Sequence, residues 1–268
     1  MSSVNPVSQN SFNANHKLYD KVRPGFDQGA VDFLINELKV TKGSKVLELA
    51  VGTGKFTRAI ADNGYDLLAV EPSTGMLESF RANFPDIPSL EGSSYKLPVE
   101  DNSQEAVIAA QAFHWFADVT SLKEIARVLK PGGKLGLIWN FENAKTDELP
   151  SDYWKNAVFD YMNELSGNNP QYAKMGWRKV FEEEQPYFKT PIGEHIVKYE
   201  RSMPIDRELL WGRLKSISFI TALSPERQEE VHAEIIRRFD NGLLPEEKAS
   251  NEVKLHSGVH LVWVEVNK

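Results

Sequence analysis

The apolar and polar positions of residues 26–140 follow two alternating periods, which predicts strands separated by helices. Apolar runs short enough to be buried strands cover 45–49, 66–70, 106–110 and 134–139, and a short strand is expected at 89–91 after the break at 85–88. Apolar residues at helical spacing cover 26–38, 56–63, 76–83 and 121–129. Strands that alternate with helices indicate a mostly parallel sheet with helices on both of its faces.

The pattern changes after residue 140. The next 50 residues are rich in polar and aromatic side chains, and their helical stretches predict a lid inserted after the fifth strand. Two later runs have strand character, and we expect the last strand to run antiparallel beside the sixth. The whole pattern predicts a Rossmann-like α/β fold with a seven-stranded, mostly parallel sheet. We divide the chain into an N-terminal flap, a core, a lid and a segment that completes the sheet, at 1–25, 26–140, 141–190 and 191–268.

Composition and charge narrow the class of protein. The 268 residues carry a formal net charge of −7, so no broad basic face is available to bind nucleic acid. The absence of cysteine excludes disulfides, thiolate metal sites and a cysteine nucleophile. No apolar run approaches the roughly 18 residues of a membrane span, and the polar N-terminus lacks a signal sequence. We therefore expect a cytoplasmic protein, a monomer or a homodimer, whose partner is a small molecule.

The most informative segment joins the first strand to the following helix. It contains Gly52 and Gly54, an arrangement typical of a strand, a tight turn and a helix N-terminus that binds a nucleotide. A phosphate-binding P-loop would need glycine at Leu49 and serine or threonine at Phe56, so this kind of site is excluded. A dinucleotide loop would need a third glycine at Thr57, so NAD binding is disfavoured.

Two carboxylates accompany this loop. Glu48 precedes the glycines, and Glu71 ends the next strand about 20 residues beyond the loop, where a carboxylate can accept hydrogen bonds from both ribose hydroxyls. Ligands of parallel sheets bind at the carboxyl ends of the strands, so both carboxylates should lie at one sheet edge. These residues predict a site for a nucleoside without phosphate groups.

Five ordered motifs resemble class I S-adenosylmethionine-dependent methyltransferases, and among them the small-molecule type 11 branch. The motifs are the glycine loop, Ala69-Val70-Glu71-Pro72-Ser73 with Met76, Leu97-Pro98, Gln111-Ala112-Phe113-His114-Trp115-Phe116, and Leu129-Lys130-Pro131-Gly132-Gly133. The segment Phe113-His114-Trp115 is also similar to trans-aconitate methyltransferases. The resemblance implies S-adenosylmethionine as the cofactor and methyl transfer as the activity.

The resemblance also implies which residues bind the cofactor. They come from the flap and from the ends of the first four strands: Tyr19, Arg23, Glu48, Ala50, Gly52, Gly54, Glu71, Pro72, Met76, Ser93, Ser94 and Gln111. Two of them depart from the family pattern. Ala50 replaces the first glycine of the loop, which should restrict backbone approach to the methionine part of the cofactor. Ser93 replaces an aspartate that often faces the adenine.

Methyl transfer from a sulfonium group needs no covalent nucleophile and no metal, but it needs an oriented acceptor and the exclusion of water. We expect an oxygen acceptor. A carboxylate needs no base at neutral pH, whereas a hydroxyl does, and His114 is the candidate for this base or for substrate positioning. Arg23 and Arg213 are candidates for orienting an anionic substrate. Large side chains near the cleft are candidates for substrate binding, with core packing as the alternative: His114, Trp115, Phe116, Trp139, Tyr153 and Trp154.

Two other functions stay open on the sequence alone. A methyltransferase-like fold can bind the cofactor without transferring a methyl group, either as a cyclase or as a regulator of a partner. Formation of S-adenosylhomocysteine separates these functions from methyl transfer. An NAD-linked oxidoreductase is least favoured, because Thr57 stands where its loop needs glycine.

Overall fold

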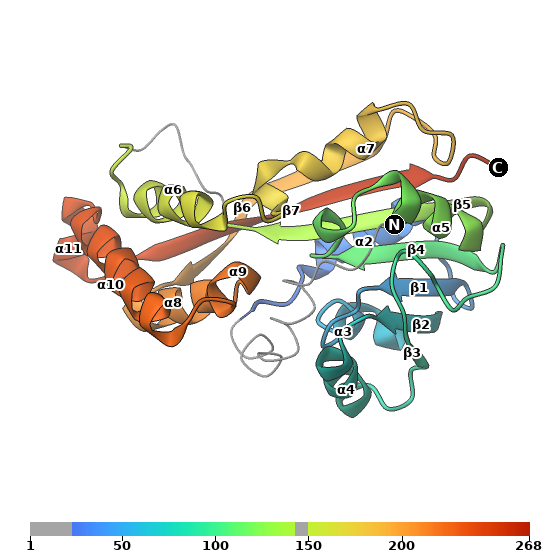
Figure 1. Ribbon diagram of the computed structural model, residues 1–268, viewed down its shortest axis with the longest axis horizontal. Coiled ribbons are helices and arrows are strands. Elements are labelled where there is room, and N and C mark those ends of the chain that lie inside the picture. The colour runs from blue at the N-terminus through green and yellow to red at the C-terminus, as the bar shows by residue number, and fades with distance from the viewer. Residues whose placement is uncertain (1–22, 143–149) are drawn as a thin grey trace.

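The computed structural model describes residues 23–142 and 150–268, whose strands form one sheet in the order β3-β2-β1-β4-β5-β7-β6 (Figure 1). The strands are β1 Lys45–Leu49, β2 Asp66–Glu71, β3 Ser89–Glu91, β4 Gln104–Ala110, β5 Leu129–Phe141, β6 Gly193–Pro204 and β7 Lys254–Glu265. Neighbouring strands from β3 to β5 are parallel, whereas β7 is antiparallel to both β5 and β6. The predicted α/β fold, with a mostly parallel sheet and an antiparallel C-terminal strand, is confirmed.

Helices cover both faces of this sheet. The longer ones are α2 Gln28–Leu38, α4 Thr74–Asn83, α5 Val119–Val128, α6 Trp154–Ser166, α8 Arg207–Lys215, α10 Pro225–Asn241 and α11 Pro245–Ser250. Single turns are α3 Thr57–Ile60, α7 Lys179–Glu182 and α9 Ser218–Thr221, with short 3-10 turns η1 Ala61–Asn63, η2 Phe113–Trp115, η3 Tyr172–Lys174 and η4 Gly176–Arg178. Helix α2 packs on one face through Leu34 and Leu38, and α5 packs on the other through Leu122 and Ile125.

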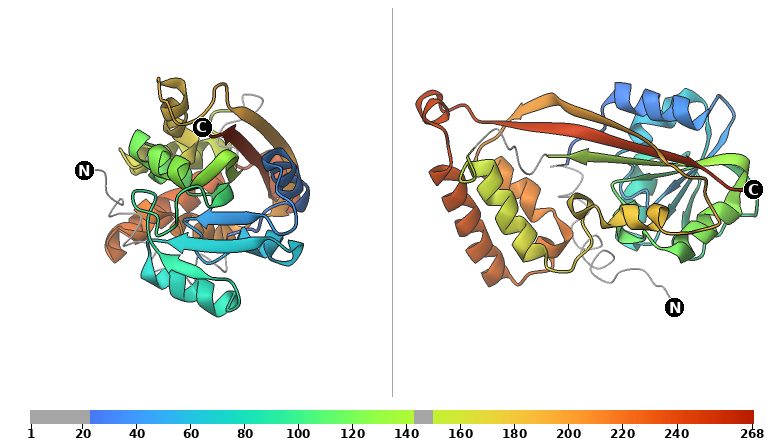
Figure 2. Two further views of the ribbon diagram at one scale, coloured as in Figure 1. Left: turned by 90° about the vertical axis from the view of Figure 1, so that its right-hand side faces the viewer. Right: turned by 90° about the horizontal axis from the view of Figure 1, so that it is seen from above.

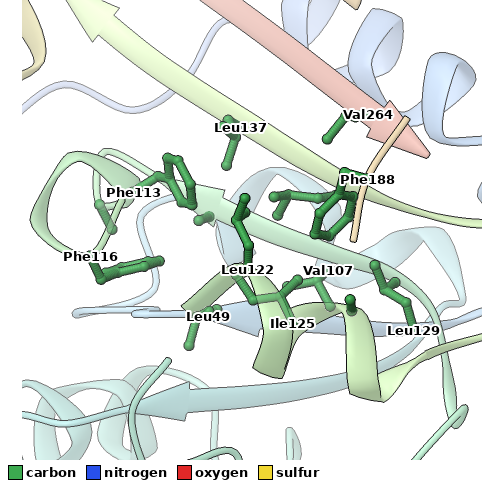
Figure 3. Close-up of a cluster of buried hydrophobic side chains, with 14 of the residues drawn as sticks. Leu49, Val107, Phe113, Phe116, Leu122, Ile125, Leu129, Leu137, Phe188 and Val264 are labelled. Carbon is green, nitrogen blue, oxygen red and sulfur yellow. The ribbon is translucent and has the colours of Figure 1, made fainter. Parts of the chain in front are cut away.

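The α5 face holds the largest apolar cluster of the described chain (Figure 3). Its side chains come from the sheet, for example Val107 and Leu137, and from α5, for example Leu122. Phe113 and Phe188 add two aromatic rings from segments 75 residues apart. The amphipathic stripe of α5, fully buried against the central strands, therefore fixes the end of β4 and the segment that follows it.

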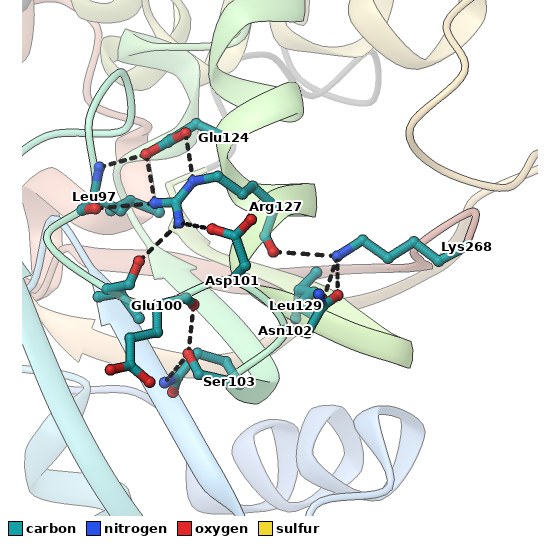
Figure 4. Close-up of polar contacts among 11 residues, drawn as sticks. Leu97, Glu100, Asp101, Asn102, Ser103, Glu124, Arg127, Leu129 and Lys268 are labelled. Carbon is teal, nitrogen blue, oxygen red and sulfur yellow. Dashed lines mark hydrogen bonds and ion pairs between the residues drawn. The ribbon is translucent and has the colours of Figure 1, made fainter.

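A network of polar contacts lies at the C-terminal end of α5 (Figure 4). Arg127 donates hydrogen bonds to Glu124, to Asp101 and to the carbonyl oxygen of Leu97. The ammonium group of Lys268 donates to the carbonyl oxygens of Arg127 and Leu129. This network ties the loop before β4 and the C-terminal residue to the same helix, at the edge of the sheet remote from the glycine loop.

The predicted turn at Pro131-Gly132-Gly133 lies within β5. Residues Gln104 and Ala106 of β4 pair with Leu129 and Lys134, so the segment between the last two bulges out of the sheet. Gly132 has a φ of 76°, which explains why the pattern of a tight turn occurs inside a strand.

A helical body lies at one end of the molecule, and β6 and β7 extend from the sheet to reach it (Figure 2). Its helices α6, α8, α9 and α10 share a separate apolar cluster, with Trp154, Leu214, Ile220, Ile235 and Phe239 among its buried members. The predicted lid, residues 141–190, contributes to two places. Helix α6 joins the helical body, whereas Trp177, Phe181 and Phe188 belong to the cluster on the α5 face of the sheet.

Candidate active site

A first cavity lies where β1, β2 and β4 end. Its wall combines the glycine loop after β1, the turn after β2, the segment after β3 and the exit of β4. Most of the predicted cofactor-binding residues meet here: Glu48, Ala50, Gly52, Glu71, Pro72, Met76, Ser93, Ser94 and Gln111. This convergence follows from the topology, because the carboxyl ends of parallel strands share one edge of the sheet.

The glycine loop has a backbone that few residues adopt. Ala50, Gly52 and Gly54 have φ values of 56°, 60° and 87°, all in the left-handed region. A Cβ atom on Gly54 would lie 2.3 Å from the ring of Phe84, so this glycine is also required by close packing. Ala50 therefore has a left-handed backbone of the kind that favours glycine, and its methyl group lies on the cavity wall.

Glu71 joins the loop to the end of β2. Its two carboxylate oxygens accept hydrogen bonds from the backbone N–H groups of Gly52 and Ser73, each at 2.9 Å. Burial raises the pKa of Glu71 to about 7, although both hydrogen bonds oppose this shift. A carboxylate oxygen has two lone pairs, so each oxygen of Glu71 can accept a further hydrogen bond from the cavity.

Glu48 is buried beneath the loop. Its carboxylate accepts a 2.6 Å hydrogen bond from the hydroxyl of Thr57, the residue that stands where a dinucleotide loop has its third glycine. Burial raises the pKa of Glu48 to about 8, against the lowering effect of that hydrogen bond. The pair connects β1 to the first turn of α3, a role for Thr57 that its position in the motif did not reveal.

The wall of the first cavity also includes residues that were not predicted as site residues. Phe26 and Lys55 lie on its wall, and so does Tyr95, whose hydroxyl donates to Asp118 at 3.0 Å. Among the predicted cofactor residues, Gly54 belongs to the loop without lining the cavity, and Arg23 lines a second cavity. Tyr19 lies outside the described residues.

The second cavity has a volume of about 510 Å³ and lies between the sheet edge and the helical body. It shares four wall residues with the first cavity: Phe26, Lys55, Gln111 and Trp115. Its remaining wall comes from distant segments and includes Met162 of α6, Arg213 of α8, Phe219 of α9 and His260 of β7. A ligand in the first cavity and a ligand in the second would therefore meet at Gln111 and Trp115.

His114 lines the second cavity. Burial lowers the pKa of its imidazole to about 3, so the ring is neutral at pH 7. The indole Nε1–H of Trp139 donates to Nδ1 of His114 at 3.3 Å, which places the imidazole proton on Nε2. Nε2–H is a donor, so of the two roles predicted for His114 this geometry favours substrate positioning over proton abstraction.

The predicted substrate residues divide between the cavities and the core. Trp115 lines both cavities and Phe116 lines the first. The structure does not place the other three at either cavity. Trp139 is fully buried against Trp177, Trp154 packs on Phe239, and the hydroxyl of Tyr153 donates to Glu247. All three are therefore packing residues.

Charged and hydrogen-bonding side chains of the second cavity come from segments without a recognisable motif. Arg213 is 3% exposed and forms an ion pair with Glu142. Arg23 donates to the hydroxyl of Ser216 at 2.9 Å, so the two arginines named from the sequence lie on one cavity. Tyr172 and Glu142 line the same cavity, and no motif in the sequence marks either of them.

Comparison with known proteins agrees with this geometry. Residues 47–137 match the family model of a methyltransferase domain. An uncharacterized methyltransferase-like protein of Schizosaccharomyces pombe is 34% identical over 218 residues, which are 81% of this chain and 81% of the relative. An uncharacterized methyltransferase of Mycobacterium bovis is 40% identical over 130 residues, which are 48% of this chain and 52% of the relative.

Solved structures share the fold at low sequence identity. The YcgJ protein from Bacillus subtilis has a TM-score of 0.57 at 16% identity and covers 90% of this chain and 100% of its own. Phosphoethanolamine N-methyltransferase 2 from Haemonchus contortus was solved with phosphomonomethylethanolamine and S-adenosylhomocysteine. It has a TM-score of 0.56 at 14% identity, over 100% of this chain and 61% of its own.

The sheet and the first cavity define an α/β protein with a cavity at the carboxyl edge of its parallel strands. Sequence similarity over four fifths of this chain and of the Schizosaccharomyces pombe relative identifies the family to which the chain belongs. The chain belongs to the S-adenosylmethionine-dependent methyltransferases, and its cofactor is S-adenosylmethionine. The predicted enzyme class and cofactor are confirmed.

The residues of the first cavity fit this cofactor. The free lone pairs of Glu71 suit ribose hydroxyls, and the left-handed loop at Gly52 presents backbone to the ligand without a side chain. Met76 and Trp115 supply apolar surface on the same wall. No helix within the described ranges combines the length and the apolar character that crossing a membrane would require.

Proposed function

We propose that this methyltransferase transfers the methyl group of S-adenosylmethionine to an oxygen atom of a small molecule that binds in the second cavity. The observation that supports this most strongly is the shared wall of the two cavities at Gln111 and Trp115. A volume of about 510 Å³ lies within the range of small-molecule sites. The charge of −7 and the size of the second cavity favour a small acceptor over a nucleic acid.

The bound cofactor supplies an electrophilic methyl group, and the chain supplies orientation and a dry environment. Glu71 accepts hydrogen bonds from the ribose hydroxyls, while Gly52 allows the backbone to lie along the ligand. On the acceptor side, Nε2–H of His114 donates a hydrogen bond to the acceptor oxygen and holds it toward the first cavity. Holding two reactants in line can lower the barrier by several kcal/mol.

We further propose that the helical body acts as the lid of this site. The body consists of α6 together with α8 to α11, so the functional lid draws on residues beyond 141–190. Met162, Arg213 and Phe219 project from it into the cavity wall. In this proposal residues 26–140 bind the cofactor and the helical body selects the acceptor. The trans-aconitate-like specificity is one case of such an acceptor.

The first test is a calorimetric titration with S-adenosylhomocysteine, with NADH as the control ligand. We expect micromolar affinity for S-adenosylhomocysteine alone. The change Glu71→Ala should weaken it by about 1 to 3 kcal/mol, because buried ribose hydroxyls lose charge-assisted partners. Glu78→Ala, at an exposed position of α4, is the matched control and should leave the affinity unchanged.

Turnover then tests the acceptor. Labelled S-adenosylmethionine is incubated with a panel of small carboxylic acids, phenols and alcohols, and methylated product and S-adenosylhomocysteine are both measured. An oxygen-methylated product supports the proposal. Tight cofactor binding without any methyl transfer across acids, phenols, alcohols, amines and thiols would favour a regulatory or cyclase role. Products methylated on nitrogen or sulfur would overturn the oxygen assignment.

A further inference from the structure

A chain of hydrogen bonds runs from Glu194, a partly exposed residue of the edge strand β6, through the buried His260 of β7 to the wall of the second cavity. The hydroxyl oxygen of Tyr172 lies 2.7 Å from Nδ1 of His260, and Nε2 of His260 lies 2.6 Å from Oε1 of Glu194. Arg178 forms an ion pair with the same carboxylate. Tyr172 and His260 both line the cavity, and His260 is fully buried.

The partners fix the direction of every hydrogen bond in this chain. Paired with Arg178, Glu194 is a carboxylate and only accepts. Burial lowers the pKa of His260, although Glu194 opposes the shift, so a neutral ring donates from Nε2 to Glu194 and accepts at Nδ1. Tyr172 must then donate its own proton to Nδ1. Its oxygen consequently offers only lone pairs to the cavity.

Aromatic packing holds Tyr172 in place on the cavity wall that also carries His114, the proposed hydrogen-bond donor. The ring of Tyr172 lies 5.2 Å from that of Trp139 and stacks on Trp177 at 6.5 Å. Trp139 is also the residue that fixes the tautomer of His114. One buried indole therefore positions a hydrogen-bond donor, His114, and an acceptor, Tyr172, on one cavity wall.

We propose that Tyr172, His260 and Glu194 form a proton relay for a neutral hydroxyl acceptor, with Tyr172 as the residue that contacts the reacting hydroxyl. This inference rests on the proposed methyl transfer and deepens it by selecting a hydroxyl over a carboxylate. A hydroxyl can donate to Tyr172 and accept from His114 at the same time. A carboxylate has no proton to donate, and it would face the lone pairs of Tyr172.

The step balances without another reactant. The oxygen of the acceptor forms a bond to the methyl carbon as the carbon–sulfur bond breaks and its electron pair stays on sulfur. The hydroxyl proton moves to the oxygen of Tyr172, whose own proton moves to Nδ1 of His260. The resulting imidazolium is stabilised by the Glu194 carboxylate, and the excess proton reaches solvent through Glu194, whose side chain is partly exposed. Burial and the nearby charge of Glu194 raise the pKa of Tyr172, which agrees with a phenol that passes a proton on rather than a standing phenolate.

Binding of simple probes to the protein saturated with S-adenosylhomocysteine tests this relay without knowledge of the natural acceptor. Phenol represents the hydroxyl acceptors and benzoate the carboxylates, and both are titrated into wild type, Tyr172→Phe and Tyr65→Phe. Tyr65 lies before β2, at the opposite end of the sheet, and serves as the matched control. We expect phenol to bind wild type and Tyr65→Phe more tightly than benzoate does, and Tyr172→Phe to lose about tenfold in phenol affinity.

The outcomes separate this inference from the proposed function. Failure to bind S-adenosylhomocysteine would contradict the cofactor site itself. With that binding intact, benzoate affinity equal to or above phenol affinity would overturn the relay, and so would equal or undetectable phenol binding by wild type and Tyr172→Phe. If Tyr172→Phe does not fold, Glu194→Gln replaces it, because loss of the carboxylate frees the tautomer of His260 and should weaken phenol binding similarly.

A spectroscopic measurement distinguishes a relay from a packing role. The chain has six histidines, and ¹⁵N-histidine labelling with His260→Gln as the assignment variant identifies the signals of His260. We expect an unprotonated Nδ1 and a protonated Nε2 in wild type, with a change at Nδ1 in Tyr172→Phe. The opposite tautomer would mean that Tyr172 directs its proton into the cavity, and the relay would be excluded.

Discussion

The two cavities of this methyltransferase are built in different ways. The first takes most of its wall from four short segments that follow consecutive strands of a parallel sheet, and each segment carries a motif. The second takes its wall from β5, β7, the helical body and the segment around Tyr172, which are far apart in the chain. The proposed cofactor site thus depends on local backbone geometry, whereas the proposed acceptor site depends on how distant elements pack. This contrast predicts that the two sites can be damaged separately.

The largest effect is expected for Gly54→Ala in the first site. The new Cβ would lie 2.3 Å from a ring carbon of Phe84, and an alanine at a φ of 87° is strained besides. Overpacking and the left-handed backbone together should destabilise the protein by about 2 to 5 kcal/mol. Urea unfolding measures the stability, and calorimetry should show the loss of S-adenosylhomocysteine binding.

Gly176→Ala is the matched control for this change. Gly176 is exposed in η4, its backbone is not left-handed, and a Cβ there meets no atom within 4 Å. It should leave both stability and cofactor binding close to wild type. If Gly54→Ala behaved like Gly176→Ala, the glycine loop would not control the first site.

The second prediction concerns pH and the buried carboxylate of Glu48. Its pKa is raised by burial from 4.5 to about 8, so the stabilising contribution is present below pH 4.5 and is lost as the pH rises through 8. Glu48→Gln removes this titration and can still accept the hydrogen bond from Thr57. As the pH rises from 5.5 to 7.5, the free energy of unfolding of the variant should increase by about 2 to 3 kcal/mol relative to that of wild type. The reason is that one pKa unit corresponds to about 1.4 kcal/mol.

Urea unfolding of the cofactor-free protein at several pH values measures this difference. Glu78→Gln, at an exposed site on α4, should follow the pH dependence of wild type. Parallel curves for Glu48→Gln and wild type would show that Glu48 titrates at its ordinary pKa and that its burial is relieved in solution.

The sequence predicted the first site because its geometry leaves marks on single residues. Gly52 and Gly54 mark a left-handed loop, and Glu71 marks the end of a strand that must lie beside it. The second site leaves no such marks. Tyr172 and His260 are 88 residues apart, and their hydrogen bond exists only because β7 lies beside β5, under the segment that carries the tyrosine. Periodicity predicts each element but not which distant side chains will share a cavity.

The large aromatic residues that were predicted near the acceptor show the same limit of prediction from periodicity. Trp154 and Tyr153 were predicted near the acceptor because they are large and aromatic, and both proved to be core residues of the helical body. Size and aromatic character are shared by pocket walls and packed cores, so only the position of α6 against α10 separates the two. Arg213 was predicted as a candidate for orienting an anionic substrate, yet its ion pair with Glu142 follows from no spacing in the chain.

The third prediction affects the second site alone. Gly242 follows α10, and its carbonyl oxygen accepts a hydrogen bond from the N–H of Trp154 at the start of α6. A Cβ on Gly242 would lie 2.3 Å from that nitrogen and 2.4 Å from the carbonyl oxygen of Asp152, both backbone atoms that cannot move aside cheaply. Gly242→Ala should therefore loosen the helical body by about 1 to 3 kcal/mol.

Hydrogen exchange locates this effect. We expect faster exchange in α6 and α10, a lower rate of methyl transfer, and S-adenosylhomocysteine affinity within about twofold of wild type, a change smaller than one neutral hydrogen bond contributes. The comparison partner is again Gly176→Ala. Equal loss of cofactor binding and of helical-body protection would mean that the two sites unfold as one unit.

The smallest effect is expected for Ala50→Gly, which restores the residue that the family has at this position. Ala50 has a φ of 56°, so glycine relieves a strain of about 1 to 2 kcal/mol, but it also adds about 0.5 to 1 kcal/mol of unfolded-state entropy. The net gain in stability should stay below about 1 kcal/mol, and removal of a methyl group from the wall should tighten cofactor binding slightly.

Ala110→Gly is the control, because Ala110 lines the same cavity from β4 with an ordinary backbone. The free energy of unfolding of Ala110→Gly should be lower than that of wild type by about 0.5 to 1 kcal/mol. Opposite signs for the two alanines in urea unfolding would show that backbone conformation, rather than side-chain volume, governs the first site, whereas equal losses would show that Ala50 is not strained.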